Sequence, residues 1–196
     1  EWGSTGRVFI SKYVNRSNTD IYEYYLDGEK IYGMPTPKLR ESDRLTKNSA
    51  IETEPALSPD GRYLALISDR TGSPQVYVRD MQRKKNTRIT ENGNYNVSPS
   101  WSPDGKFIAY ASRRSGVSSI YRIDPKSKEE NRVTPKNMNA ESPTWSPDGS
   151  MIAFSGKKGG DWKIFYSLSS GGQAVRLTNS KAGLQETMPS WGPSLR

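Results

Sequence analysis

Short apolar runs recur along the chain, and each is bounded by residues that favour turns. Tyr63–Ile67, Phe107–Ala111 and Met151–Ser155 are each five residues long, which is the length of a strand and well short of a helix. Each run closely follows the sequence Ser-Pro-Asp-Gly. In such a turn proline sets φ, aspartate bonds nearby backbone and glycine accepts a positive φ. The pattern therefore predicts an all-β chain of short strands joined by tight turns.

These turns belong to a repeat of 44 residues. Ser142–Gly149 reads Ser-Pro-Thr-Trp-Ser-Pro-Asp-Gly, Ser98–Gly105 differs from it at one position, and Glu54–Gly61 reads Glu-Pro-Ala-Leu-Ser-Pro-Asp-Gly. The final glycines of the three stretches are spaced by 44 residues. A period of this size decides the architecture, because one repeat cannot bury its apolar face alone.

Each repeat contains four predicted strands. In the third repeat they span 143–145, 151–155, 163–168 and 174–178. The fourth strand carries an Arg-apolar-Thr sequence, which recurs at 44–46, 88–90 and 132–134. Four strands in a repeat of about 40–45 residues are the signature of a β-propeller blade of four antiparallel strands.

The N-terminal unit contains an insertion. Its second and third strands match the next repeat at an offset of 55 residues, whereas Arg44-Leu45-Thr46 matches at 44. An 11-residue insertion therefore lies between the third and fourth strands, within about 24–43. The Asp27-Gly28 turn and two prolines predict an extended hairpin or loop there.

The two ends of the chain complement each other. Thr187–Trp191 reads as another first strand, whereas only Glu1-Trp2 precedes the second strand of the first unit. We expect Thr187–Trp191 to pair beside Val8–Ser11 and to close a monomeric ring of four blades, because an open ring exposes sheet edges. The alternative is part of a larger six-bladed ring. The closed ring predicts one domain over 1–196, with blades at about 1–48 plus 187–191, 49–92, 93–136 and 137–180.

Composition excludes several kinds of chemistry. The chain has no cysteine and no histidine, so disulfides, thiol catalysis, a Ser-His-Asp triad and most transition-metal sites are excluded. No Gly-x-Ser-x-Gly elbow occurs. No apolar run approaches the ~20 residues of a membrane span. We predict no catalytic residue, no cofactor and no metal.

The charge balance is basic, with a formal net charge of +8. This would suit an anionic polymer, but a solvated surface explains it better because no run of five or six like charges occurs. Nucleic acid is therefore a disfavoured partner.

The repeat resembles the TolB-like β-propeller repeat family. The matching pattern is Pro-x-Trp-Ser-Pro-Asp-Gly, an apolar strand, Ser-Asp-Arg-x-Gly at 68–72, Ile/Val-Tyr, and then Arg-apolar-Thr. The family's namesake is similar to a six-bladed ring behind an extra N-terminal domain, and neither is recognisable here. The resemblance implies a periplasmic or cell-envelope protein that docks envelope lipoproteins and complexes, including the peptidoglycan-associated lipoprotein. The same repeat also forms gating domains of prolyl-oligopeptidase-like peptidases and domains of some polysaccharide-degrading enzymes.

The function predicted from the resemblance is a non-enzymatic protein–protein interaction module of the bacterial cell envelope. The alternative is an accessory or gating propeller of a larger peptidase or polysaccharide-degrading enzyme. Fold alone does not choose between the two.

Basic side chains gather in the loops between second and third strands, which share one face of a propeller. Arg70, Arg114 and Lys158 occupy one repeat position, and Arg113 and Lys157 lie beside two of them. They form either a basic crown for an acidic partner or, for the recurring Arg70 and Arg114, part of the repeat framework. Arg113, Lys157 and Lys158 depart from the repeat and are the better binding candidates.

The insertion supplies candidates on the opposite face. Tyr24, Tyr25, Tyr32, Met34 and Lys38 would form an interface patch, since Tyr and Met are enriched at interfaces. An ordinary loop tucked against its own blade is an equal alternative.

Two repeated residue types are structural rather than functional in our interpretation. The turn aspartates lack the oxygen-rich ligand set that calcium needs. The repeated tryptophans lie on strands, which favours packing between blades over stacking on sugars or bases. These residues are Asp60, Asp104, Asp148, Trp101, Trp145 and Trp191.

Overall fold

A computed structural model describes residues 6–15, 17–26, 39–157 and 159–192 of the chain. Strands are the regular elements of this part of the chain, and no helix within it is long and apolar enough to cross a membrane. The strands are β1 (Gly6–Asn15), β2 (Asn18–Leu26), β3 (Leu39–Arg44), β4 (Glu52–Leu57), β5 (Tyr63–Ser68), β6 (Gln75–Asp80), β7 (Lys85–Arg88), β8 (Tyr95–Trp101), β9 (Ile108–Arg114), β10 (Val117–Ile123), β11 (Glu130–Arg132), β12 (Asn139–Trp145), β13 (Met151–Lys157), β14 (Lys163–Leu168) and β15 (Val175–Arg176).

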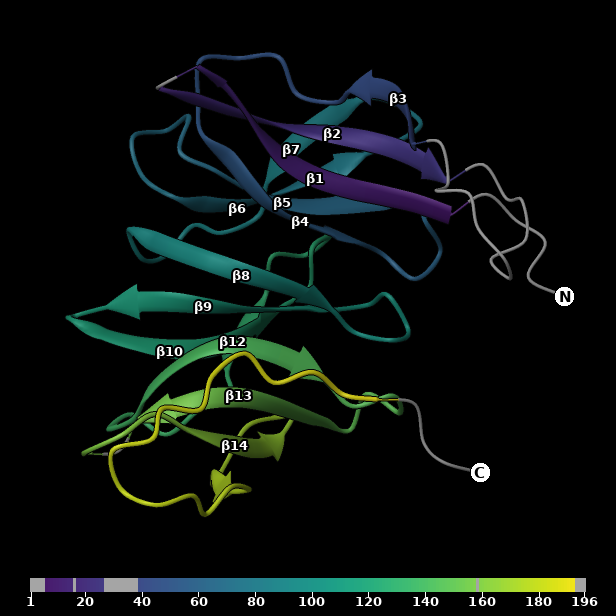
Figure 1. Ribbon diagram of the computed structural model, residues 1–196. Coiled ribbons are helices and arrows are strands. Elements are labelled where there is room, and N and C mark those ends of the chain that lie inside the picture. The colour runs from purple at the N-terminus through teal and green to yellow at the C-terminus, as the bar shows by residue number, and fades with distance from the viewer. Residues whose placement is uncertain (1–5, 16, 27–38, 158, 193–196) are drawn as a thin grey trace, which may run out of the picture.

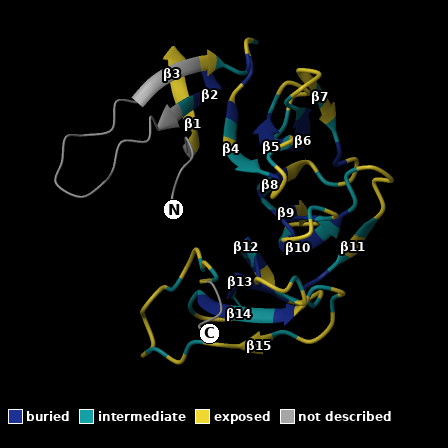
Figure 2. Ribbon diagram, turned by 90° about the vertical axis from the view of Figure 1, so that its right-hand side faces the viewer, coloured by how far each residue is buried: buried dark blue, intermediate teal, exposed yellow. Residues whose placement is uncertain are grey.

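The strands form four antiparallel sheets, each in the up-and-down order of a propeller blade (Figure 1). The first sheet is β1-β2-β3, and the others are β4 to β7, β8 to β11 and β12 to β15. Figure 2 shows the sheets arranged in an arc, with the first and fourth sheets at its two ends. The predicted all-β propeller architecture is confirmed.

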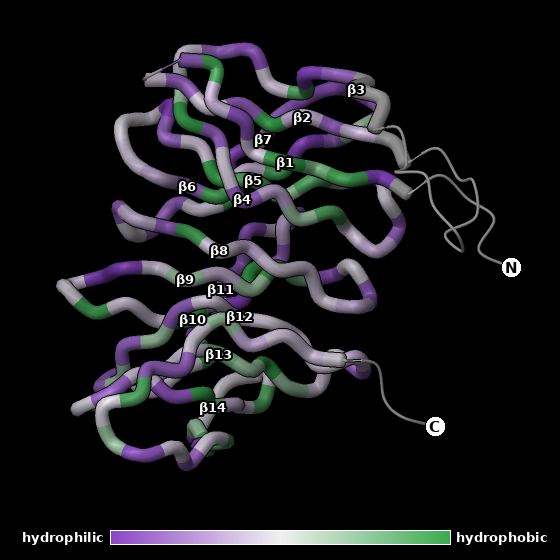
Figure 3. The backbone as a smooth tube through the Cα atoms, in the orientation of Figure 1, coloured by the Kyte–Doolittle hydropathy of each residue, from purple (hydrophilic) through white to green (hydrophobic). Residues whose placement is uncertain are grey.

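Apolar side chains fill the spaces between successive sheets. Figure 3 shows the hydrophobic residues concentrated along the strands and the hydrophilic ones in the connections. One cluster joins Ile67, Val76 and Ile89 of the second sheet to Trp101 and Tyr110 of the third. A second cluster in the same way joins the third sheet to the fourth. The second, third and fourth sheets therefore bury one another's facing sides.

Every complete first strand has a bulge, and in β8 and β12 it aims a tryptophan at the preceding blade. Glu54, Ser98 and Ser142 have φ of 52°, 55° and 53°, and the register of each strand shifts just after them. Beyond the bulge, Trp101 Nε1 donates to Ala56 O at 3.0 Å and Trp145 Nε1 to Ser100 O at 2.9 Å. These two tryptophans therefore link blades, as the packing interpretation expects.

The turn aspartates bond their own turns. Ser58, Ser102 and Ser146 donate from Oγ to the turn aspartate at 2.6, 2.7 and 2.5 Å. The same Oδ1 accepts a backbone N–H two residues on, at 3.1 Å in all three turns. The glycine that follows has φ of 69° to 72°, a conformation in which a Cβ would be strained.

A threonine fastens the fourth strand to the third in every blade. Thr46, Thr90, Thr134 and Thr178 accept at Oγ1 from the backbone N–H of the third strand at 2.9 to 3.1 Å. Two residues earlier, the arginine of the same motif donates from Nε to the threonine carbonyl in each blade. The Arg-apolar-Thr sequence is thus a repeated clasp.

The predicted pairing of Thr187–Trp191 with Val8–Ser11 is not formed in the described structure, where β1 pairs only with β2. The segment instead lies along the fourth sheet, where Met188 N donates to Ser155 Oγ at 2.9 Å. The reason lies in the residues that precede the segment. Lys163 Nζ donates to Leu184 O at 2.7 Å and Asp161 accepts from Gly183 N at 2.6 Å, so the chain leading to it is held on its own blade. Ring closure and blade count remain predictions.

The insertion is described only at its flanks. The ladder between β2 and β3 continues as far as the pair Leu26 and Leu39, in keeping with an extended hairpin. Its tip, which holds the candidates Tyr32, Met34 and Lys38, lies outside the described residues, as does the side chain of Tyr25.

The clasp makes a prediction about stability. Thr134→Val keeps the side-chain shape but leaves the buried Ile120 N–H without its acceptor, so we expect the free energy of unfolding to fall by about 1–3 kcal/mol. The control is Thr87→Val, the same change at an exposed position, which should stay within about 0.5 kcal/mol. Urea denaturation followed by tryptophan fluorescence measures both, and equal effects would contradict the clasp.

The turns make a prediction about acid sensitivity. Hydrogen bonds from Ser146 and Ser150 lower the pKa of Asp148 from 3.8 to about 2. A lowered folded-state pKa stabilises the fold above the unfolded value, and the effect is lost as the pH falls from about 4 towards 2. Asp148→Asn should therefore lower the urea midpoint at about pH 6 and approach wild type as the pH falls through this window. A difference that is independent of pH would refute it.

Candidate protein-binding rim

Three cross-strand pairs lie where first strands begin and second strands end, on one face of the propeller. They are Ile51 with Asp69, Tyr95 with Arg113, and Asn139 with Lys157. Successive pairs are 44 residues apart in the sequence, so each takes the equivalent place in its blade. We call these six residues the inner rim. It contains two of the predicted binding candidates, Arg113 and Lys157.

Tyr95 and Arg113 are the most interface-like pair of the inner rim. The Arg113 guanidinium carbon lies 4.9 Å from the centroid of the Tyr95 ring. Tyr95 is 41% exposed, and Arg113 is exposed as well. Tyr and Arg are enriched among the residues that dominate binding energy at interfaces, and their stacking holds both side chains in place before a partner arrives.

Exposed apolar residues on the same face were missed by sequence reasoning. Ile51 of the inner rim is 46% exposed, and Tyr13, near the end of β1, is 84% exposed. For Tyr13 the missed signal was departure from the repeat. Tyr13 stands where the other blades have Ser68, Ser112 and Gly156.

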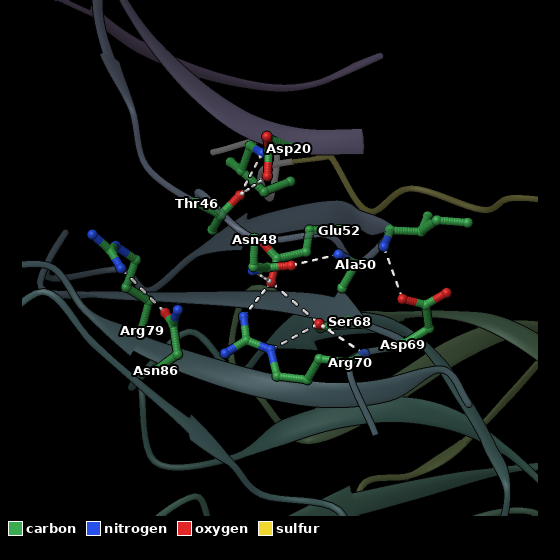
Figure 4. A network of polar contacts seen from close by, with 12 residues as sticks. Asp20, Thr46, Asn48, Ala50, Glu52, Ser68, Asp69, Arg70, Arg79 and Asn86 are labelled. Atoms are coloured by element: carbon green, nitrogen blue, oxygen red, sulfur yellow. Dashed lines mark hydrogen bonds and ion pairs between the residues drawn. The ribbon is translucent and has the colours of Figure 1, made fainter. Parts of the chain in front are cut away.

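Arg70 is held by contacts within its own blade (Figure 4). Its guanidinium pairs with the fully buried Glu52, and its Nε donates to Ser68 Oγ at 3.0 Å. Asn48 Nδ2 reaches the same Glu52 Oε1 at 2.9 Å. The Arg70 guanidinium carbon also lies 4.8 Å from the centroid of the Tyr77 ring. These are the contacts expected of a framework residue.

Arg114 is held in the same manner but by a different carboxylate. It forms two hydrogen bonds with Glu130, at 2.7 and 2.9 Å, and its guanidinium carbon lies 3.7 Å from the centroid of the Tyr121 ring. The Tyr110 hydroxyl donates to Glu130 Oε2 at 2.5 Å, and this oxygen also accepts one of the two hydrogen bonds from Arg114. Burial, with the neighbouring Glu130, raises the pKa of Tyr110. For Glu130 burial acts to raise the pKa, but the bonds from Arg114 and Tyr110 outweigh it and lower the pKa.

The structure therefore separates the predicted basic crown into two kinds of residue. Arg70 and Arg114 are occupied by ion pairs with largely buried carboxylates. Arg113 and Lys157 lie one residue earlier along the strand and belong to the inner rim. Lys158 lies outside the described residues.

The opposite face carries two open grooves between successive turns. They have volumes of about 490 and 340 Å³. Pro103, Asp104 and Phe107 line both grooves, and these are turn and core residues of the repeat. Within the described residues no three acidic side chains gather closely enough to hold a metal ion.

Fold and rim together define a β-propeller repeat protein with a candidate partner-binding face. The family described as "TolB beta propeller domain" matches residues 23–195. The chain therefore belongs to the TolB β-propeller family, and the predicted family is confirmed.

The similar proteins match this chain over very different lengths. The "Tol-Pal system protein TolB" of Bordetella pertussis is 50% identical over 34 residues, which are 17% of this chain and 8% of that protein. The crystal structure of TolB from Acinetobacter baumannii superposes with a TM-score of 0.70 at 24% identity, covering 90% of this chain and 42% of that one. A puromycin-hydrolysing peptidase from Mycobacterium tuberculosis has a TM-score of 0.66 at 13% identity, covering 92% and 28%. The chain thus spans less than half of these proteins, and the two structures share its fold.

Arg113 and Arg114 are neighbours in the sequence, so they test the division between inner-rim and framework residues. Arg114→Ala should lower the free energy of unfolding by about 2–4 kcal/mol, because it leaves the largely buried Glu130 without its partner and uncovers Tyr121. Arg113→Ala removes an exposed side chain and should change it by less than about 0.5 kcal/mol. Chemical denaturation compares the two variants, and a destabilised Arg113→Ala would place Arg113 in the framework.

Proposed function

We propose that this chain is a non-enzymatic interaction module of the bacterial cell envelope that binds a protein partner through the inner rim. The observation that carries the proposal is the stacked pair of Tyr95 and Arg113, exposed on a face where the framework arginines Arg70 and Arg114 are already paired. Family membership supports the envelope setting, since a matched relative is a Tol-Pal system protein.

The partner we propose is an envelope lipoprotein or a complex containing one, in the periplasm. The inner rim offers two cations, one carboxylate and two large apolar side chains. A complementary partner would present acidic and apolar groups together. Binding of this kind depends on a few anchor residues at the centre of the contact rather than on total area.

A gating or accessory role in a larger hydrolase is the second candidate. It is favoured by the likeness in fold to a puromycin-hydrolysing peptidase. The chain contains no histidine, so a Ser-His-Asp triad would have to lie in another domain. A longer gene product with a hydrolase domain would decide for this candidate.

The rim is tested by comparing two stacked arginines on opposite faces. Cross-linking to a panel of purified envelope lipoproteins, the peptidoglycan-associated lipoprotein among them, selects the partner, and calorimetry gives its Kd. Arg113→Ala and Tyr95→Ala should each weaken binding about tenfold or more, the range of interface anchors. The control is Arg62→Ala on the turn face, where Arg62 stacks on Tyr63 at 5.2 Å.

Arg62→Ala should leave Kd unchanged. If Arg62→Ala weakens binding and Arg113→Ala does not, the partner uses the turn face and the rim proposal fails. If no lipoprotein of the panel binds, the envelope role fails with it.

A further inference from the structure

An arginine stands between the third and fourth blades at a position that the preceding junction fills with an apolar side chain. The residue 44 positions before Arg122 is Val78. Val78 is buried in the apolar cluster that contains Trp101. Arg122 instead lines a pocket together with Trp145, the equivalent of Trp101 one blade later. The third blade therefore places a cation where the repeat places part of its core.

The Arg122 side chain is held by stacking and not by an ion pair. Its guanidinium carbon lies 4.7 Å from the centroid of the Phe107 ring. Its Nε is buried and has no hydrogen-bond partner within the described part of the chain. The ion pairs formed by the described residues do not include it. A buried donor without a partner costs the fold stability, so Arg122 is a candidate for contact with a ligand.

The pocket beside Arg122 is the smaller of the two grooves on the turn face, with a volume of about 340 Å³. Its apolar walls are the two aromatic residues Phe107 and Trp145 and the turn prolines Pro103 and Pro147. Sites for small ligands commonly combine such apolar walls with a few polar groups that fix the orientation of the ligand. Here the guanidinium of Arg122 is the group that would do so.

Two carboxylates also line the pocket, but both are engaged by their own turns. Asp104 Oδ2 lies 3.2 Å from Lys106 Nζ. Asp148 Oδ2 accepts from Ser150 Oγ at 2.8 Å. Their negative charge disfavours a ligand with two charges, such as a phosphate monoester. A carboxylate carries one charge, and its two oxygens match the planar fork of a guanidinium.

We propose that this pocket binds a carboxylate that is attached to an apolar body. The carboxylate pairs with Arg122, and the apolar body lies against Phe107 and Trp145. Two sources offer this chemistry, the free C-terminus of a peptide that ends in an apolar residue and a free aromatic or aliphatic acid. The pocket lies on the face opposite the inner rim, so this proposal does not rest on the proposed function.

Titration of the 196-residue chain with N-acetyl-L-phenylalanine, followed by NMR of the indole N–H groups, is the first test. The Trp145 signal should shift with a Kd of about 1 mM or tighter, whereas the Trp101 signal should not move. N-acetyl-L-phenylalaninamide lacks the charge and phenyl phosphate carries two, and both should bind about tenfold or more weakly. The proposal fails if the acid does not bind, or if either of these analogues binds as tightly as the acid.

A longer ligand distinguishes the two sources. The tripeptide N-acetyl-Ala-Ala-Phe has the same terminal carboxylate and ring but extends beyond them. If the tripeptide binds as tightly as N-acetyl-L-phenylalanine, the pocket accepts peptide C-termini. If the tripeptide binds about tenfold more weakly, the pocket accepts the free acid. Either result supports the carboxylate site.

Substitution of Arg122 by the residue of the preceding blade is the second test. Arg122→Val should weaken binding of N-acetyl-L-phenylalanine about tenfold or more. Its urea midpoint should stay at or above that of wild type, because replacing a partly buried charge with an apolar side chain is often neutral or stabilising. Arg122→Lys keeps the charge but loses the planar fork, so it should weaken binding as well.

The control is Lys106→Ala, which removes an exposed positive charge that lines the larger groove. It should leave Kd unchanged. If Arg122→Val binds the acid as wild type does, the proposal is wrong. If Lys106→Ala weakens binding as much as Arg122→Val, the attraction is a general effect of charge and the assignment to Arg122 is wrong.

Discussion

The second, third and fourth blades of this protein depend on one another to bury their facing sides. Trp101 and Trp145 express that dependence most directly, since each fills the space against the preceding blade and donates its indole N–H to a backbone carbonyl there. The contact needs a bulge with positive φ just before the tryptophan and a tight turn just after it. The sequence Ser-Pro-x-Trp-Ser-Pro-Asp-Gly supplies both, since its first serine, Ser98 or Ser142, is the bulge residue and its end is the turn.

The basic side chains of one face are of two kinds, those paired within their own blade and those free to contact a partner. Arg70 and Arg114 occupy the same position of the repeat. Both form ion pairs with carboxylates of their own blades, Glu52 and Glu130. One residue earlier along the strand, the side chain points to the rim. There the exposed Arg113 stacks on Tyr95. Function on this scaffold therefore lies where a residue departs from the repeat pattern.

The fold could be predicted from the sequence because its determinants are local. Turn chemistry, short apolar runs and a fixed 44-residue period each act within one repeat, and the Arg-apolar-Thr clasp follows the same period. The inner rim could be predicted only in part. Arg113 and Lys157 were found as departures from the repeat, but Tyr95 and Ile51 look like ordinary strand residues until the cross-strand pairs are known.

The position of residues 187–191 could not be predicted, because it is determined by contacts with residues distant in the sequence. The segment has the sequence of a first strand, so its pattern is compatible with either sheet. Lys163 and Asp161 decide in favour of the fourth sheet by binding the residues that precede it. Neither residue shows this role in the sequence, where they look like surface charges near a glycine-rich loop.

Binding through the inner rim is the central claim, and amide hydrogen exchange in the presence of the selected lipoprotein tests it most directly. The account predicts slower exchange at the rim, in residues 93–96 and 112–114, with unchanged exchange in the turns at 58–62 and 102–106. Slower exchange in those turns, with none at the rim, would contradict it.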